Sequence, residues 1–215
     1  MKTLLVYGSG GFGAEILEIY NSSYRDNYSQ LVCIDDYVSK NYNKVFKDTE
    51  IITLKEAINR YNKNNSKIVI STARPDFRRD ILNKINETNL SLTSIIDKEA
   101  IIRPSAVIEE GSVVCAQSYI SSNSVLLCNS IVHGQVLIGH DVEIGKHSSI
   151  YVGANILGGT KIGNEVEIGS GASIYPNIEI GDNCKIAMGS CVYKDVPKNS
   201  LVQGNPARII KKYVE

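Results

Sequence analysis

The sequence lacks an excess of charge of either sign. It contains 23 Lys and Arg residues against 23 Asp and Glu residues, so its formal net charge is zero. This balance argues against attraction of the whole chain to nucleic acid or to an anionic membrane. No apolar stretch approaches the roughly 20 residues of a membrane span, and glycines interrupt the short apolar start MKTLLVYGSGGFG. We therefore expect no nucleic-acid partner, no membrane segment and no signal peptide.

The sequence also lacks paired cysteines. Its five cysteines form no CxxC motif and have no spacing typical of metal ligands. An odd number of such thiols favours reduced cysteines in the protein core and a cytoplasmic location. We expect no bound metal.

What the sequence does contain is an aliphatic residue at every sixth position. The series runs without a gap from Ile96 to Val192, and a small or modest-sized residue follows four positions after each member except the last. A period of six fits neither a helix nor an isolated alternating strand. It is typical of hexapeptide repeats, in which three repeats complete one coil of a triangular prism. Residues 96–215 are therefore predicted to form a left-handed parallel β-helix with a C-terminal cap, in which residues 18 apart stack.

Residues 1–95 follow a different pattern. Apolar runs at 2–7, 30–34 and 67–71 alternate with helical spacing at 14–20 and 76–87, a last strand is expected at 92–96, and surface connections are expected at 21–28 and 61–66. Strands that alternate with helices predict a small Rossmann-like domain with a parallel sheet. With one βαβαβ unit, this domain fits a nucleotide diphosphate better than a whole NAD.

A glycine-rich turn joins the first strand to the first helix. Glycines allow a tight turn and close approach of a phosphate to the helix N-terminus. The second strand ends in Asp35-Asp36, where an acid can accept a ribose hydroxyl or a base NH. The candidate residues of the turn are Gly8, Gly10, Gly11, Phe12 and Gly13.

The three histidines, His133, His140 and His147, all lie in the repeat, seven residues apart. We expect them at outward or corner positions on different faces of the prism. They therefore cannot meet in one chain to form a tris-His zinc site. Hexapeptide prisms commonly pack as trimers, in which an outward histidine faces a cleft between subunits.

His140 is the candidate general base. Asp141 follows it and can hold the imidazole in one tautomer. Eighteen residues on, Gly158 is predicted one coil above, where its backbone NH could polarise a carbonyl. A surface histidine beside a common glycine corner remains the alternative. A covalent acyl-enzyme on Cys115, below His133, is a weaker one.

The chain resembles the bacterial nucleotide-sugar acetyltransferases. This group includes the bacillosamine, perosamine and viosamine N-acetyltransferases and the sialic-acid O-acetyltransferases. The motifs that carry the resemblance are VYGSGGFGAE, CIDD, STARPDFRRDI, IGHDVEIG, VGANILGGTKIG and KDVPKNSLVQGNPARI.

The resemblance implies a nucleotide-sugar site in residues 1–95 and a homotrimer with acetyl-CoA between neighbouring prisms. The adenine end of acetyl-CoA would lie towards Asn205, Pro206 and Ala207. His140 matches the family's base, Asp141 its acidic neighbour and Gly158 its backbone donor. Relatives often carry Asn where this chain has His133, and His where it has Ser149. Both positions border the acceptor pocket, so they bear on the choice of sugar.

These features predict acetyl transfer from acetyl-CoA to the amine of a nucleotide-linked 4-amino-4,6-dideoxy sugar, in surface polysaccharide or glycan synthesis. Two alternatives remain open. One is O-acetylation of sialic acid or a related sugar. The other is a non-catalytic or metal-binding β-helix scaffold.

Overall fold

The computed structural model describes residues 2–37 and 48–213. The chain folds into two compact units, Met1–Ile95 and Ile96–Glu215. In the described part of the chain, no helix combines the length and the apolar character needed to cross a bilayer.

The first unit is an α/β unit built on a four-stranded parallel sheet. Its order is β3-β2-β1-β4, and the neighbouring strands are parallel. Leu4, Leu5 and Val6 of the central strand are completely buried, as the apolar run predicts. The elements are β1 (Lys2–Tyr7), α1 (Gly11–Ser23), β2 (Tyr28–Ile34), β3 (Glu50–Ile52), α2 (Leu54–Arg60), β4 (Ser66–Ile70) and α3 (Pro75–Asn86).

Three details of this unit differ from the sequence prediction. Helix α1 continues to Ser23 and β2 begins at Tyr28, so the connection expected at 21–28 is shorter. Strand β3 and helix α2 were not predicted from the sequence. The signal for α2 was local: Thr53 and Glu56 form a capping box at its start. Towards the end of the unit, Leu92 only bridges Ile68, and the regular strand β5 is Ile95–Ile96.

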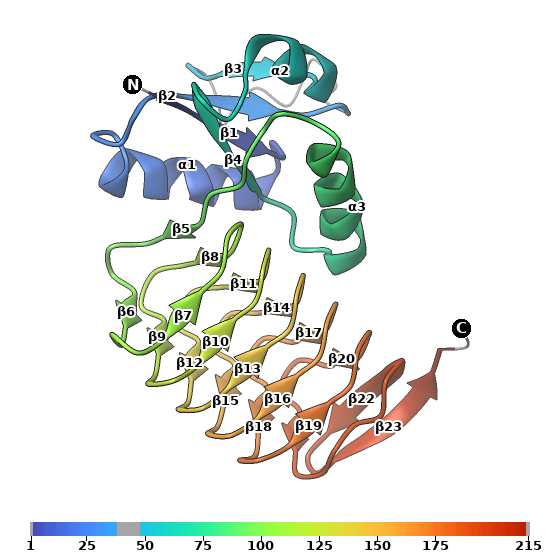
Figure 1. Cartoon of the computed structure of the whole chain (residues 1–215). Coiled ribbons are helices and arrows are strands. Elements are labelled where there is room, and N and C mark those ends of the chain that lie inside the picture. The colour runs from blue at the N-terminus through green and yellow to red at the C-terminus, as the bar shows by residue number, and fades with distance from the viewer. Residues whose placement is uncertain (1, 38–47, 214–215) are drawn as a thin grey trace. The chain divides into compact units, whose positions relative to one another are not determined.

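The second unit is the predicted left-handed β-helix. Its two-residue strands stack into three parallel sheets, and successive coils lie one above another (Figure 1). The strands of the coils are β6 (Ile101–Ile102), β7 (Val107–Ile108), β8 (Val113–Val114), β9 (Tyr119–Ile120), β10 (Val125–Leu126), β11 (Ile131–Val132), β12 (Leu137–Ile138), β13 (Glu143–Ile144), β14 (Ser149–Ile150), β15 (Asn155–Ile156), β16 (Lys161–Ile162), β17 (Glu167–Ile168), β18 (Ser173–Ile174), β19 (Glu179–Ile180), β20 (Lys185–Ile186) and β21 (Cys191–Val192).

The six-residue series builds the core of the prism. Ile120, Ile138 and Ile156 pair in register with their stacked neighbours and are completely buried. Small residues of the repeat lie near the corners of the prism. The Ser124 hydroxyl, for example, donates a hydrogen bond to Gly139 O at 2.6 Å. Several corner residues, including Asp141, have a positive φ, a conformation that Asp and Asn tolerate better than most residues.

A hairpin closes the C-terminal end of the coils. Strand β22 (Ser200–Gly204) continues the sheet of β20 in parallel, and β23 (Ala207–Lys212) returns antiparallel to β22. These strands extend the sheet edge of the last coil, as expected for a cap.

Candidate active site

His140 and Asp141 form a hydrogen-bonded pair at the corner between β12 and β13. His140 Nδ1 lies 2.7 Å from Asp141 Oδ2, and both side chains are more than half exposed. Asn123, one coil below Asp141, donates its Nδ2–H to Asp141 Oδ1 at 3.1 Å. The hydrogen bond from His140, and then the one from Asn123, hold the pKa of the Asp141 carboxyl below its usual range. A charged Asp141 favours a proton on Nδ1 and leaves Nε2 as the basic nitrogen.

Gly158 lies directly against the imidazole of His140. A Cβ added to Gly158 would stand only 2.6 Å from His140 Nε2, and Gly159 N donates to His140 O at 2.9 Å. The 18-residue spacing therefore brings this backbone segment to the base, as the repeat predicts. Only glycine at position 158 leaves room for the His140 ring where it lies.

A second glycine keeps the Gly158 amide open. A Cβ at Gly139 would stand 2.7 Å from Gly158 N. Among the described residues, the amide of Gly158 donates no hydrogen bond, whereas its carbonyl accepts one from Asn177 N. A basic nitrogen and an open N–H donor thus lie together, which is the arrangement that acyl transfer requires.

The other two histidines have different surroundings. His133 lies outside the aliphatic core of the prism, as expected, but it is buried, and its ring stacks on that of Tyr151 one coil above at 5.1 Å. His147 Nδ1 lies 3.1 Å from Asn129 Nδ2. The three histidines thus have separate partners: Tyr151, Asp141 and Asn129.

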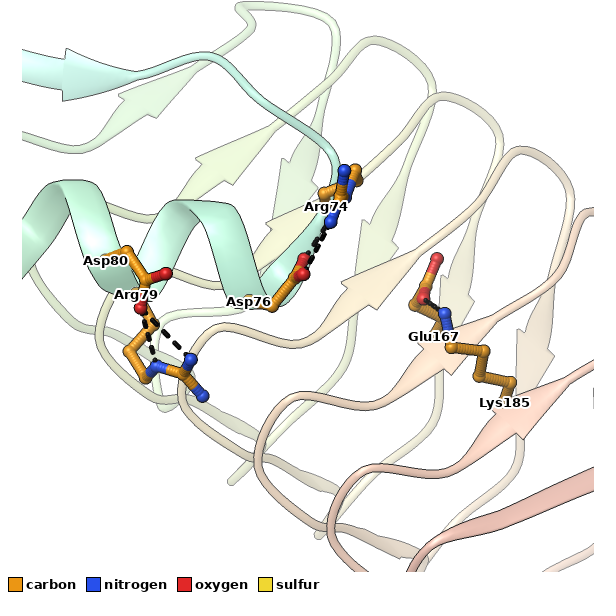
Figure 2. A network of polar contacts seen from close by, with 6 residues as sticks. All are labelled: Arg74, Asp76, Arg79, Asp80, Glu167 and Lys185. Atoms are coloured by element: carbon orange, nitrogen blue, oxygen red, sulfur yellow. Dashed lines mark hydrogen bonds and ion pairs between the residues drawn. The ribbon is translucent and has the colours of Figure 1, made fainter. Parts of the chain in front are cut away.

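Tyr151 belongs to a polar network on the sheet that contains β14, β17 and β20. Its hydroxyl donates to Glu167 Oε2 at 3.1 Å, and Lys185 Nζ lies 2.6 Å from Glu167 Oε1. Figure 2 shows Glu167 and Lys185 on their neighbouring strands. Ser149, the other departure from the family pattern, is buried in this sheet and pairs with Glu167. Cys115 is also buried, one coil below His133.

In the first unit, the glycine-rich turn begins where β1 ends. Gly8 has a φ of +120°, and a Cβ at Gly13 would stand 2.1 Å from Gly8 O, so the turn requires glycine at both positions. Gly10 and Gly11 face open space, and no side chain caps the N-terminus of α1. Phe12 is half-buried in the first turn of the helix. A helix start with this much open space suits a phosphate group.

Asp35 and Asp36 already accept hydrogen bonds from their own unit. Asp35 Oδ2 accepts the backbone N–H of Ser9 at 3.0 Å and also its hydroxyl, so this carboxylate holds the glycine-rich turn. Asp36 accepts the Tyr7 hydroxyl at 2.7 Å and Leu54 N–H at 2.8 Å. Burial, and then the hydrogen bond to Asp36, raises the pKa of Tyr7.

The start of α3 carries an exposed ion pair from the STARPDFRRDI motif. Arg74 Nη2 lies 2.6 Å from Asp76 Oδ2, as drawn in Figure 2. Ser71, just before it, places its hydroxyl 2.8 Å from Tyr7 O and 3.0 Å from Gly8 O. Ser71 therefore supports the glycine-rich turn from the end of β4.

A cavity of about 620 Å³ lies at the C-terminal end of the prism. Pro206 and Ala207 contribute to its lining, together with Tyr193, Lys194 and Arg208. Asn205, which precedes them, is exposed. The segment that the resemblance assigned to acetyl-CoA therefore borders a cavity large enough for part of a ligand.

Some site residues were not identified from the sequence. The 18-residue spacing could have identified Asn123, which lies one coil below Asp141, and Tyr151, which lies one coil above His133. No comparable pattern points to Ser9, Tyr7 or Ser71, whose roles depend on the tertiary structure of the α/β unit.

Three family models match parts of the chain. Residues 3–85 match the PglD N-terminal domain. Residues 135–176 match the hexapeptide repeat of succinyl-transferase, and residues 159–194 match the bacterial transferase hexapeptide.

Solved structures resemble nearly the whole chain. The acetyltransferase domain of PglB from Neisseria gonorrhoeae is 27% identical, with 98% of this chain and 100% of that chain covered and a TM-score of 0.89. The same domain has been solved in complex with acetyl coenzyme A. PerB from Caulobacter crescentus, solved with CoA and GDP-perosamine, has the same fold at 20% identity, with a TM-score of 0.88 and 98% of each chain covered.

Curated relatives match shorter segments. The putative acetyltransferase YvoF of Bacillus subtilis is 34% identical over 77 residues, which are 36% of this chain and 31% of the relative. The matched segments span between 10% and 31% of the curated relatives' lengths. Together, these matches support an acetyl-CoA-dependent acetyltransferase.

Proposed function

We propose that this chain, which fits the nucleotide-sugar acetyltransferase group, N-acetylates a nucleotide-linked 4-amino-4,6-dideoxy sugar with acetyl-CoA. The observation that carries the proposal is the contact between His140 and Gly158, where a basic nitrogen adjoins an open backbone N–H. Support for the acceptor comes from PerB, a structural neighbour solved with GDP-perosamine. No metal takes part in the proposed reaction, and the product would serve surface polysaccharide or glycan synthesis.

The reaction proceeds by direct attack. The sugar amine attacks the thioester carbonyl carbon while His140 Nε2 accepts a proton from the amine. The Gly158 N–H stabilises the negative charge that develops on the carbonyl oxygen. The C–S bond then breaks, and the CoA thiolate takes the proton back from His140. Asp141, hydrogen-bonded to Nδ1, holds the ring in orientation and stabilises its protonated form.

The acceptor binds through its nucleotide diphosphate. The uncapped start of α1 and the open space at Gly10 and Gly11 support a phosphate site there. The carboxylate oxygens of Asp35 and Asp36 have lone pairs beyond those engaged within the unit, and these can accept a ribose hydroxyl or a base NH. His133 and Ser149 border the acceptor. The working protein is a homotrimer in the cytoplasm, with sites between subunits.

The decisive variant is His140→Ala. Loss of a general base lowers kcat by ~10²–10⁴. The rate is followed as release of free CoA thiol, with a panel of nucleotide-linked amino sugars as acceptors. Wild-type turnover in His140→Ala would refute the assigned base.

Calorimetric titration separates the acceptor classes. UDP, dTDP, GDP and CMP are titrated into the full-length protein, and we expect one of them to bind. Binding of none would favour the alternative acceptor, a free sialic acid or related sugar. Metal analysis of the purified protein tests the scaffold alternative, since one zinc per subunit interface would contradict the acetyltransferase proposal.

A further inference from the structure

The corners of the prism carry a repeated contact between side chains one coil apart. Each of the three corners of one coil holds a residue with a positive φ and a side-chain amide, and this amide contacts the residue 18 positions later. The three pairs are Gln117–Gln135 at 3.1 Å, Asn123–Asp141 at 3.1 Å and Asn129–His147 at 3.1 Å. An amide contact between coils is therefore a common feature of these corners.

The pair of Asn123 and Asp141 differs from the other two because its upper residue also holds the candidate base. Asp141 Oδ1 accepts the Nδ2–H of Asn123, and Asp141 Oδ2 lies 2.7 Å from His140 Nδ1. The two oxygens of one carboxylate thus have different partners, one on the coil below and one on the neighbouring residue. Together these contacts fix the plane of the carboxylate.

The backbone of this corner is held independently of the Asn123 side chain. Asp141 N donates to Ser122 O at 3.0 Å, and Gly159 N donates to His140 O at 2.9 Å. The Asp141 side chain, in contrast, is more than half exposed, and an exposed side chain changes rotamer rapidly unless hydrogen bonds hold it. Loss of the Asn123 amide should therefore release the carboxylate while the corner itself remains.

An amide suits this position chemically. Its Nδ2–H is a neutral donor, so it orients the carboxylate and leaves the negative charge available to His140. A cation there would neutralise the carboxylate, and a second carboxylate would repel it. The backbone N–H of Asn123 donates to Ser105 Oγ at 3.1 Å, so Asn123 is itself held from the coil below.

We propose that Asn123 is a positioning residue for the candidate active site, which orients the Asp141 carboxylate so that it holds the Nδ1–H tautomer of His140. The inference rests on the proposed function, because it takes His140 as the general base. Without Asn123 the carboxylate rotates away for part of the time. A larger share of His140 then carries its proton on Nε2, where it cannot accept one from the acceptor amine.

Kinetics of Asn123→Gly test this role. The change removes the amide and keeps the backbone conformation, because glycine adopts a positive φ without strain. We expect kcat to fall about fivefold, the effect of one hydrogen bond, at an unchanged KM for acetyl-CoA. Gln117→Gly is the matched control. It breaks the equivalent contact in the same coil, at a φ of +59°, and should keep the wild-type kcat. Wild-type kcat in Asn123→Gly would overturn the inference.

A double variant shows whether Asn123 acts through Asp141. Asp141→Gly removes the carboxylate and also keeps the backbone conformation, at a φ of +57°. Adding Asn123→Gly to this variant should cause no further loss of kcat, because the amide has already lost its partner. A further fivefold loss would contradict the inference, since Asn123 would then act outside this contact.

Nitrogen-15 NMR of the imidazole rings gives a readout that needs no acceptor. The signals of His140, identified by their absence from His140→Gln, should show the neutral ring protonated mainly on Nδ1 in the wild-type protein. In Asn123→Gly the share protonated on Nε2 should rise, and an unchanged share would overturn the inference. If this share rises but the wild-type protein acetylates no nucleotide-linked amino sugar, the proposed acceptor is refuted and the role of Asn123 stands.

Discussion

The candidate functional groups of the two units differ in whether they also hold the local structure together. In the α/β unit, the acids beside the glycine-rich turn accept hydrogen bonds from Ser9, Tyr7 and Leu54, so the same groups hold the local structure. In the prism, His140 and the Gly158 amide lie at an exposed corner, outside the aliphatic core. A substitution at a candidate functional group therefore also removes structural hydrogen bonds in the first unit, whereas in the second unit it need not disturb the core.

Gly158→Ala should disrupt the candidate active site without unfolding the prism. The added methyl group collides with the exposed ring of His140 rather than with backbone, so the imidazole moves away and the fold remains. We expect kcat to fall by at least ~10², the lower range of a lost general base. Thermal unfolding, measured in parallel, should change little.

The matched control is Gly134→Ala. Gly134 stands at another corner, where Val152 is accommodated one coil above, and its added Cβ would meet only Ala116 O at 3.3 Å. Activity and melting temperature should both stay near the wild-type values. An active Gly158→Ala enzyme would show that the ring position does not matter.

Asp35→Ala should lower both stability and nucleotide binding. It removes the acceptor of the Ser9 N–H and hydroxyl and of Tyr37 N–H. Unpaired donors of this kind cost roughly 1–3 kcal/mol, and the turn loses its support. Urea unfolding measures the first effect and calorimetry with nucleoside diphosphates the second. Asp26→Ala, an exposed acid of the same unit, is the control. Weaker nucleotide binding at full stability would contradict the coupling.

Asp141→Asn tests whether the partner of His140 acts through its charge. Asn tolerates the φ of +57° at this position, so the backbone should be retained. We expect kcat to fall by about tenfold, or roughly 1.4 kcal/mol, with little effect on the melting temperature. An unchanged rate would show that Asp141 only borders the site.

The charge of Asp141 also has a defined pH window. Because the folded pKa of Asp141 lies below its usual value near 4, the carboxylate persists above that pH and is lost only as the pH falls further. Protonation of Asp141 should therefore contribute nothing to a loss of rate at mildly acidic pH, where any loss reflects protonation of the base itself.

The smallest expected effect concerns the reactivity of the cysteine thiols. Burial raises the pKa of Cys33 to about 12, so its thiol should remain unlabelled by iodoacetamide at pH 8 in the native protein and react after unfolding in urea. Cys191, half-buried on the last coil, is the comparison and should react in the native state. Mass spectrometry locates the label. The neutral Cys33 thiol favours the fold below pH ~9, and this contribution fades as the pH rises towards 12.

The repeat explains why the sequence predicted the prism better than the α/β unit. In the prism, one spacing determines both the core and the contact between His140 and Gly158, because each coil repeats the geometry of the one below. Burial of His133 was not predictable in this way, since the spacing says nothing about what covers an outward ring. In the α/β unit, the Asp35–Ser9 and Ser71–Gly8 contacts join residues far apart in sequence, and no period relates them.

The unbroken six-residue series restricts how this protein can change in length. An insertion of six residues between Gly158 and Val192 would turn every later side chain by one face, so the C-terminal hairpin would move to another face of the prism relative to His140. An insertion of 18 residues would keep the hairpin on its face but move it about 4.8 Å further from His140. Changes in length that preserve the alignment are therefore quantised in whole coils. Each added coil would lengthen the prism by that step and leave the corner of His140 unchanged.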